Sequence, residues 1–167
     1  MEPLIPVLLV EDEPIVREVL VEVLAEGGFA AWAVAEGERA VAELQAAPGR
    51  FRAVLTDIHL PGPLVGWDVA RRARELVHDM PVVYMSGDVM QDWVSEGVPR
   101  SVMLAKPFAP VRLLAALAHL ITAGDGPRAL PYGRGTSRAT LPHRGPASRD
   151  AGPRTSGPWL TVSPGPM

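Results

Sequence analysis

The stretch LIPVLLVEDEP, residues 4–14, decides the fold class of this 167-residue chain. An apolar run of strand length ends in three acidic residues, and a segment with helical spacing follows directly. Apolar residues then recur every three or four positions from Ile15 through Val19 to Leu24, which predicts a helix with one buried face that ends at Gly27. A strand that is apolar on both faces and leads straight into a helix is typical of a parallel sheet covered by helices.

Four more runs of strand length follow, and they alternate with helical segments. The runs cover residues 29–34, 53–56, 81–86 and 101–105. The helical segments cover residues 37–47, 67–77 and 110–121, with a weaker one at 90–97. By spacing, the third helix is expected to bury Leu76 and to turn Arg74 outward. The alternation predicts an α/β fold, a five-stranded parallel sheet with helices on both faces.

Charged and hydroxyl residues follow the carboxyl ends of four of the five strands. Glu11 and Asp12 follow the first strand, Asp57 follows the third, Ser86 ends the fourth and Lys106 follows the fifth. Ligands of open parallel sheets bind outside the carboxyl ends of the strands, beside the point where the strand order reverses. If the first strand is central, in the order 2-1-3-4-5, the first and third strands flank that crevice and three carboxylates meet there.

Each of these residues also has an ordinary structural explanation. Asp12 can start a helix, Asp57 can belong to a turn, and a lysine before a proline is a common surface residue. The set is harder to explain in this way, because two like charges about 4 Å apart repel by about 4 kcal/mol at an effective dielectric of about 20. Three carboxylates therefore need a cation, and Mg²⁺, which takes oxygen ligands and keeps several waters, suits a shallow site.

Four segments resemble those of a known family. They are VLLVEDEP (7–14), VLTDIHLPG (54–62), PVVYMSG (81–87) and AKPF (105–108). In this order and spacing the chain resembles the response-regulator receiver domains of two-component signalling, which implies a flavodoxin-like fold over residues 4–121. The resemblance implies that Asp57 accepts a phosphoryl group from a histidine kinase or a phosphohistidine transfer protein. It also implies that Ser86 and Lys106 contact the incoming phosphoryl oxygens.

The resemblance further implies a ligand set for magnesium. Asp12 and Asp57 would bind Mg²⁺ directly, the backbone carbonyl of His59 would supply another ligand, and Glu11 would hold a metal-bound water. Phosphoryl transfer consists mostly of positioning and charge neutralisation, so a carboxylate nucleophile, a metal and a cation agree with this chemistry. Lys106 is the only lysine beside fifteen arginines, and its compact ammonium can follow an oxygen that moves between the free and phosphorylated states.

Two features depart from the usual receiver pattern. The segment PGPLVGWD, residues 61–68, has one residue more than the usual PGxxG spacing, which lengthens a loop beside the phosphoacceptor. Met103 stands where the family often has an aromatic residue that turns inward. Tyr84 lies on the same side of its strand as Ser86 by period-two geometry, and we expect it to replace that aromatic residue in part.

Two other functions are weighed against a phosphorylatable regulator. A receiver-shaped scaffold that binds proteins without phosphorylation has no need for the acidic, hydroxyl and lysine set. A phosphatase that uses Asp57 as a transient nucleophile is disfavoured by His59, which stands where a second aspartate is needed. We therefore expect a signalling protein that is not an enzyme but assists its own phosphorylation and dephosphorylation.

Charge and composition divide the chain near residue 122. Residues 1–121 hold 17 acidic and 10 basic residues, whereas residues 122–167 hold 2 and 6, together with 16 glycines and prolines. The sequence therefore predicts a receiver domain at 1–122 and a disordered Gly/Pro/Arg-rich tail at 123–167. We expect no DNA-binding domain in the chain, no secretory signal and no membrane span, and hence a cytoplasmic, bacterial protein.

The expected partners are a histidine kinase or phosphotransfer protein and a downstream protein target that the sequence does not identify. Phosphorylation of Asp57 is expected to change partner affinity through the fourth helix, the fifth strand and the fifth helix. We expect the protein to be a monomer, or a weak dimer that forms through the same surface.

Overall fold

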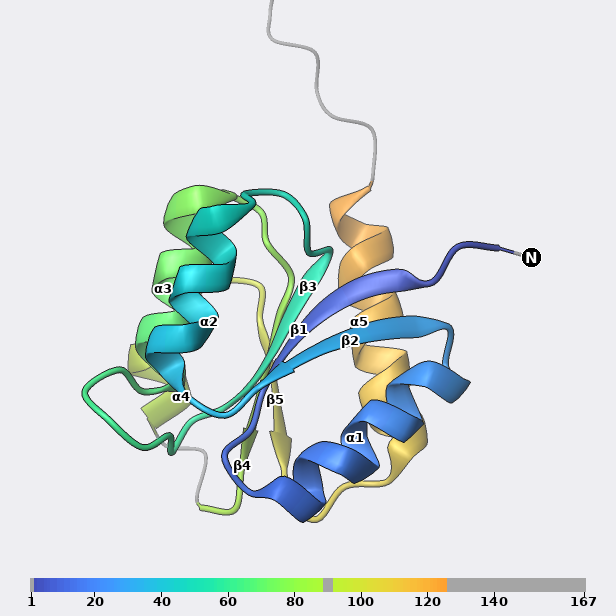
Figure 1. Cartoon of the computed structure of the whole chain (residues 1–167), viewed down its shortest axis with the longest axis horizontal. Helices are drawn as coiled ribbons and strands as arrows, with labels where there is room; N and C mark the ends of the chain where they lie inside the picture. Colours follow the sequence, from blue (N-terminus) through green and yellow to red (C-terminus); the bar gives the residue numbers. More distant parts are fainter. Residues whose placement is uncertain (1, 89–91, 126–167) are drawn as a thin grey trace, which may run out of the picture. The chain divides into compact units, whose positions relative to one another are not determined.

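The computed structural model describes residues 2–88 and 92–125, in which strands and helices alternate (Figure 1). The strands are β1 (Ile5–Val10), β2 (Phe29–Val34), β3 (Ala53–Asp57), β4 (Val82–Ser86) and β5 (Val102–Ala105). The helices are α1 (Pro14–Glu26), α2 (Gly37–Ala46), α3 (Gly66–Leu76), α4 (Trp93–Glu96) and α5 (Pro110–Gly124). Helix α5 therefore ends two residues beyond the predicted boundary at 122, and the predicted tail from residue 126 lies outside the described residues.

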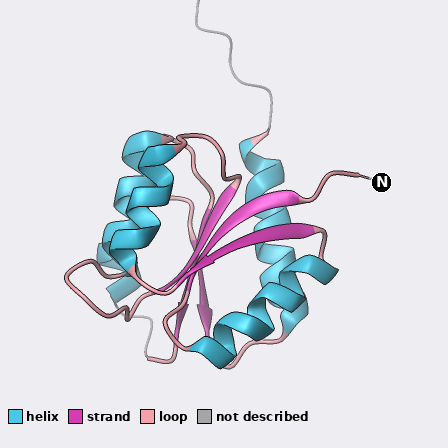
Figure 2. Ribbon diagram, in the orientation of Figure 1, coloured by secondary structure: helices cyan, strands magenta, loops and turns pink. Residues whose placement is uncertain are grey.

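The five strands form one parallel sheet in the order β2-β1-β3-β4-β5 (Figure 2). This arrangement confirms the predicted α/β fold and strand order. The chain passes from β1 to the edge strand β2 and then returns to β3 on the other side of β1. The connections that leave β1 and β3 therefore diverge, which opens a crevice at the carboxyl ends of these two strands.

Helices cover both faces of the sheet and enclose two separate apolar cores. Helices α2 and α3 pack on one face, and α1 and α5 pack on the other (Figure 1). Within β1, Leu8 and Val10 belong to the first core, whereas Val7 and Leu9 belong to the second. All four side chains are fully buried, which is why this strand reads as a continuous apolar run. Among residues 2–88 and 92–125, no helix combines the length and apolarity needed to cross a membrane.

Three apolar side chains contradict the sequence prediction. Ile15 and Val19, predicted to lie on the buried face of the first helix, are 72% and 53% exposed. Helix α1 contacts the sheet through a narrower stripe that contains Leu20 and Leu24, so the apolar surface of the helix is wider than its buried face. Leu76 is also exposed, because α3 ends at this residue and the chain turns away toward β4.

Arg74 also differs from its prediction, since it is partly buried and does not point freely outward. Its Nε donates to the Met80 carbonyl at 2.6 Å, and its Nη2 donates to the Pro99 carbonyl at 2.8 Å. Burial lowers the pKa of this guanidinium below its ordinary value. The side chain therefore joins α3 to the loops before β4 and β5.

Gly66, the first residue of α3, lies against the backbone at the end of β3. A Cβ atom at this position would be 2.1 Å from the Asp57 carbonyl oxygen and 2.8 Å from the Ile58 Cα. The Gly66 N–H donates to the Ile58 carbonyl at 2.9 Å, so the helix start and the strand end are bonded directly. The approach is this close only because glycine lacks a side chain.

Replacing Gly66 with alanine is expected to lower the free energy of unfolding by about 2 kcal/mol, because the added methyl group would overpack a backbone that cannot move cheaply. Urea denaturation of the full chain measures this change. Gly124→Ala is the matched control, since a Cβ atom at residue 124 would meet nothing within 4 Å. Equal stability of Gly66→Ala and the wild type would contradict the close approach of α3.

Candidate functional site

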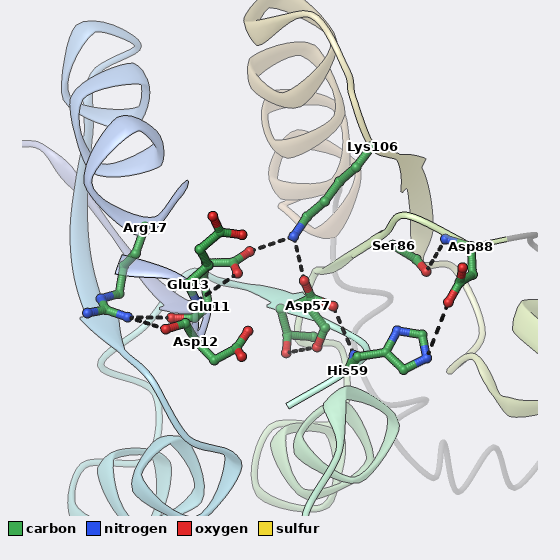
Figure 3. Close-up of polar contacts among 10 residues, drawn as sticks. Glu11, Asp12, Glu13, Arg17, Asp57, His59, Ser86, Asp88 and Lys106 are labelled. Atoms are coloured by element: carbon green, nitrogen blue, oxygen red, sulfur yellow. Dashed lines mark hydrogen bonds and ion pairs between the residues drawn. The ribbon is translucent and has the colours of Figure 1, made fainter. Parts of the chain in front are cut away.

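Lys106 joins the carboxyl ends of β1 and β3 from the far side of β4. Its Nζ donates to Glu11 Oε2 at 2.8 Å and to Asp57 Oδ2 at 2.5 Å (Figure 3). Glu11 and Asp57 are both buried, whereas the lysine side chain is 24% exposed. The long lysine stem is required because β5, from which it extends, is not a neighbour of either strand.

Both carboxylate oxygens of Asp57 accept a hydrogen bond. Lys106 donates to Oδ2, and the backbone N–H of His59 donates to Oδ1 at 2.9 Å. The adjacent backbone is held as well, because the Thr56 hydroxyl donates to the Asp57 carbonyl at 2.8 Å and the Ile58 N–H donates to the Met85 carbonyl at 3.1 Å. Asp57 is therefore held in one orientation at the base of the crevice.

The turn between β1 and α1 brings two more carboxylates to Asp57. The N–H of Glu11 donates to the Val34 carbonyl at 3.1 Å, and the N–H of Glu13 donates to Glu11 Oε1 at 3.2 Å. Carboxylate oxygens of Glu11, Asp12 and Asp57 lie within 4.8 Å of one another. The predicted convergence of these three side chains is therefore present in the fold.

This cluster fits a hard divalent cation. Its donor atoms are all oxygens, and three carboxylates offset by one ammonium leave two negative charges. Asp12 is exposed, so the cluster opens toward solvent on that side, and a magnesium ion could keep several of its waters there. The roles assigned to the His59 carbonyl and to a water on Glu11 stay predictions.

Ser86 ends β4 and is buried beside the same crevice. Its Oγ accepts a hydrogen bond from the Asp88 N–H at 3.1 Å, and its carbonyl accepts one from the Lys106 N–H at 2.7 Å. Ser86 also lines a cavity of about 150 Å³ together with His59, Trp67, Trp93 of α4 and Met103 of β5. The predicted contact of its hydroxyl group with a phosphoryl oxygen stays a prediction.

Burial and ion pairing shift the pKa values of Glu11 and Lys106 in opposite directions. Burial raises the pKa of Glu11, and the hydrogen bond and charge of Lys106 offset this effect only in part. Burial alone would lower the pKa of Lys106, but the hydrogen bonds and charges of Asp57 and Glu11 outweigh it and raise the pKa above its ordinary value. The ammonium thus stays protonated between the carboxylates.

Tyr84 is fully buried beside Met103, its partner in the register of β4 and β5. Its hydroxyl accepts a hydrogen bond from the Val98 N–H at 3.1 Å, and its ring centroid lies 4.5 Å from that of Trp67. The side chain therefore occupies the core beside the missing aromatic position. Its predicted part in signalling stays a prediction.

Sequence reasoning did not identify two residues that shape this site, Gly66 and Arg17. Arg17 donates from α1 to the carbonyls of Glu11 and Asp12. The only sequence signal was its position in the first turns of the helix, from which a long cationic side chain can reach back to the residues before it.

Comparison with known proteins identifies the family of the chain. Residues 7–118 match the response regulator receiver domain. The chain belongs to this family. The matched range contains all six predicted site residues, whose individual roles stay predictions, and receiver domains of this family are the phosphoacceptors of two-component signalling.

Individual relatives agree with this assignment. The receiver is 34% identical over 124 residues to the transcriptional regulatory protein TcrA of Mycobacterium tuberculosis, covering 73% of this chain and 48% of TcrA, so it spans about half the length of that relative. A response regulator receiver protein from Sinorhizobium medicae has a TM-score of 0.70 and 38% identity, over 72% of this chain and 97% of that one. The receiver domain of the sensor histidine kinase PA1611 from Pseudomonas aeruginosa has a TM-score of 0.62 and 28% identity, over 71% and 98%. Its structure has a magnesium ion coordinated in the active site cleft.

The raised pKa of Glu11 predicts a specific pH dependence of stability. Between the ordinary pKa of 4.5 and the raised native pKa, Glu11 holds a proton in the native receiver that it has released in the unfolded chain. The contribution of Glu11 to the free energy of unfolding therefore grows as the pH falls through the native pKa and is lost as the pH rises above it.

We expect the wild type to gain stability relative to Glu11→Gln as the pH falls from neutral toward the ordinary pKa of 4.5, measured by urea denaturation without divalent cations. Glu18→Gln, which removes an exposed carboxylate of α1, is the control and should show no such trend. A constant difference between the wild type and Glu11→Gln across this range would contradict the raised pKa.

Proposed function

We propose that Asp57 takes a phosphoryl group from a histidine kinase or a phosphohistidine transfer protein, with Mg²⁺ bound, and that this modification changes the binding of a downstream protein. The bridge from Lys106 to Glu11 and Asp57 carries the proposal. It holds an ammonium group beside a buried carboxylate at the crevice where three acidic side chains converge. The other receiver features of the chain agree with this function, and a scaffold would need none of them.

In the transfer step, a carboxylate oxygen of Asp57 forms a bond to phosphorus as the phosphorus–nitrogen bond of the phosphohistidine breaks. The electron pair of the broken bond stays with the imidazole nitrogen of the donor. The His59 N–H and Lys106 orient the attacking carboxylate, and Lys106 can then follow the phosphoryl oxygens. Ser86 is proposed to donate its hydroxyl to one of those oxygens.

Asp12, Asp57 and the His59 carbonyl would hold Mg²⁺, with Glu11 acting through a water. When bound, the ion would neutralise negative charge on the transferred group and on the cluster itself. The all-oxygen donor set of this chain supports that assignment, and so does the magnesium ion in the cleft of the Pseudomonas aeruginosa receiver domain.

An apolar groove beside Lys106 is the proposed docking surface for the donor protein. The groove has a volume of about 420 Å³ and is lined by Ile15, Val16, Val19, Leu20, Lys106, Pro107 and Phe108. Exposed apolar side chains gathered in one place usually mark an interaction surface. A donor seated here would have its phosphohistidine next to the lysine that contacts Asp57.

The downstream response is proposed to use the surface formed by α4, β5 and α5. Val94 on α4 and Val111 on α5 are 88% and 68% exposed, so this surface offers apolar contacts to a partner or to a second copy in a weak dimer. The target protein is not identified by any feature of the chain. A cytoplasmic location and a role of Tyr84 beside Met103 belong to the same proposal.

Acetyl phosphate with Mg²⁺ is expected to add the mass of one labile phosphoryl group to the wild type, measured by intact-mass spectrometry. Asp57→Asn should gain none, because the amide is not a nucleophile of this kind. Asp79→Asn, which removes an exposed carboxylate in the turn before β4, should be labelled like the wild type. No labelling of the wild type would favour a phosphorylation-independent scaffold, and turnover of many equivalents of acetyl phosphate would favour a phosphatase.

Ile15→Ser combined with Val19→Ser is expected to slow phosphotransfer from a phosphohistidine protein at least about tenfold, because burial of two large apolar side chains would be lost from the complex. The rate with acetyl phosphate should not change, since this small donor does not need the groove. Val94→Ser, which removes an even more exposed apolar side chain from α4, is the control. An unchanged transfer rate in the double variant would place the donor elsewhere.

A further inference from the structure

Arg17 contacts the acidic turn from the side away from Asp57 (Figure 3). It lies in α1, and its Nη1 donates to the Glu11 carbonyl at 2.8 Å and to the Asp12 carbonyl at 3.1 Å. One guanidinium therefore bonds to two consecutive peptide units. These two units carry both side chains that the first strand contributes to the carboxylate cluster.

The turn needs such a bond because its side chains repel one another. Glu11, Asp12 and Glu13 are consecutive, and the first two also face the charge of Asp57. Repulsion favours rotation of the peptide units so that the carboxylates separate, and Asp12 is exposed and free to turn toward solvent. A charged donor bonded to both carbonyls opposes that rotation, and such bonds are stronger than those between neutral groups.

We infer that Arg17 is a positioning residue of the metal site, which fixes the Glu11 and Asp12 peptide units so that their carboxylates point toward Asp57. The inference rests on the proposed function, because it assigns a role toward the ion that this cluster would hold. Arg17 acts through the backbone and touches neither the ion nor the phosphoryl group.

Whether magnesium affinity rises or falls when Arg17 is removed shows if this residue positions the ligands or acts only through its charge. A guanidinium near a cation site repels the incoming cation, so if Arg17 acted only through its charge, its removal would strengthen magnesium binding. If Arg17 positions the ligands, its removal weakens binding, since residues that orient metal ligands typically contribute about 10- to 100-fold to metal affinity. The two roles therefore predict opposite changes of the same Kd.

The test is titration of the full chain with MgCl₂ by isothermal calorimetry, for the wild type, Arg17→Met, Arg17→Lys and Arg72→Met. We expect Arg17→Met to raise the Kd for Mg²⁺ about tenfold. Arg17→Lys should fall between that variant and the wild type, because lysine keeps a charged donor but not the guanidinium geometry. Arg72 lies on α3 and pairs with Glu75, so Arg72→Met removes an exposed arginine away from the turn and should bind as the wild type does.

A Kd for Arg17→Met within twofold of the wild-type value, or a lower one, would overturn the inference. The melting temperature of each variant is measured as well, and titrations are made well below it, so that a general loss of stability does not imitate weaker binding. If Arg17→Met does not fold, Arg17→Lys decides by the same criterion. A wild type that binds no Mg²⁺ would instead overturn the proposed function itself, which keeps the two failures distinct.

Discussion

One ammonium group between two buried carboxylates is the interaction on which the functional end of this receiver depends. Lys106 reaches over β4 to contact Glu11 and Asp57, whose side chains are only 1% and 10% exposed. Removing such a partner would leave buried charge without compensation, which is among the most destabilising changes a core can undergo. The lysine follows β5 and its partners follow β1 and β3, and the observed strand order brings all three to the same edge of the sheet. The charge arrangement and the sheet topology are therefore coupled.

The backbone around this pairing is held as firmly as the side chains. The His59 N–H occupies the second oxygen of Asp57, and the N–H of Gly66 binds the Ile58 carbonyl, so β3 and α3 meet without space for a side chain at residue 66. Arg17 holds the opposite wall of the crevice through two carbonyls. A reactive carboxylate must keep one orientation while charge develops on its partner, and rigid backbone contacts provide this at no further entropic cost during the reaction. The crevice is thus arranged before any ligand arrives.

Next to the crevice, the chain differs in two places from the usual receiver pattern. The loop after β3 is longer by one residue, and Met103 replaces an aromatic side chain. Tyr84 occupies the neighbouring position in the sheet, but its hydroxyl is bonded to Val98 and its ring packs on Trp67. A side chain held in this way can transmit a shift of the β4 end only by moving the Val98 loop with it, because its hydrogen bond and ring contact leave little independent motion. If Asp57 is coupled to α4, as the proposed function requires, that coupling would involve the segment that contains Val98.

The amino-acid pattern by itself determined the α/β class, because a strand buried on both faces must be continuously apolar and a helix with one buried face must repeat every three or four residues. It also determined that Glu11, Asp12, Asp57 and Lys106 would share one edge, since the carboxyl ends of parallel strands always lie together. Only the tertiary structure decided that Ile15 and Val19 stay exposed, that Gly66 lies against Asp57, and that Arg17 bonds to the turn. These features depend on the angle and distance at which α1 and α3 pack on the sheet. Packing of two whole cores sets that geometry, and no local spacing of residues encodes it.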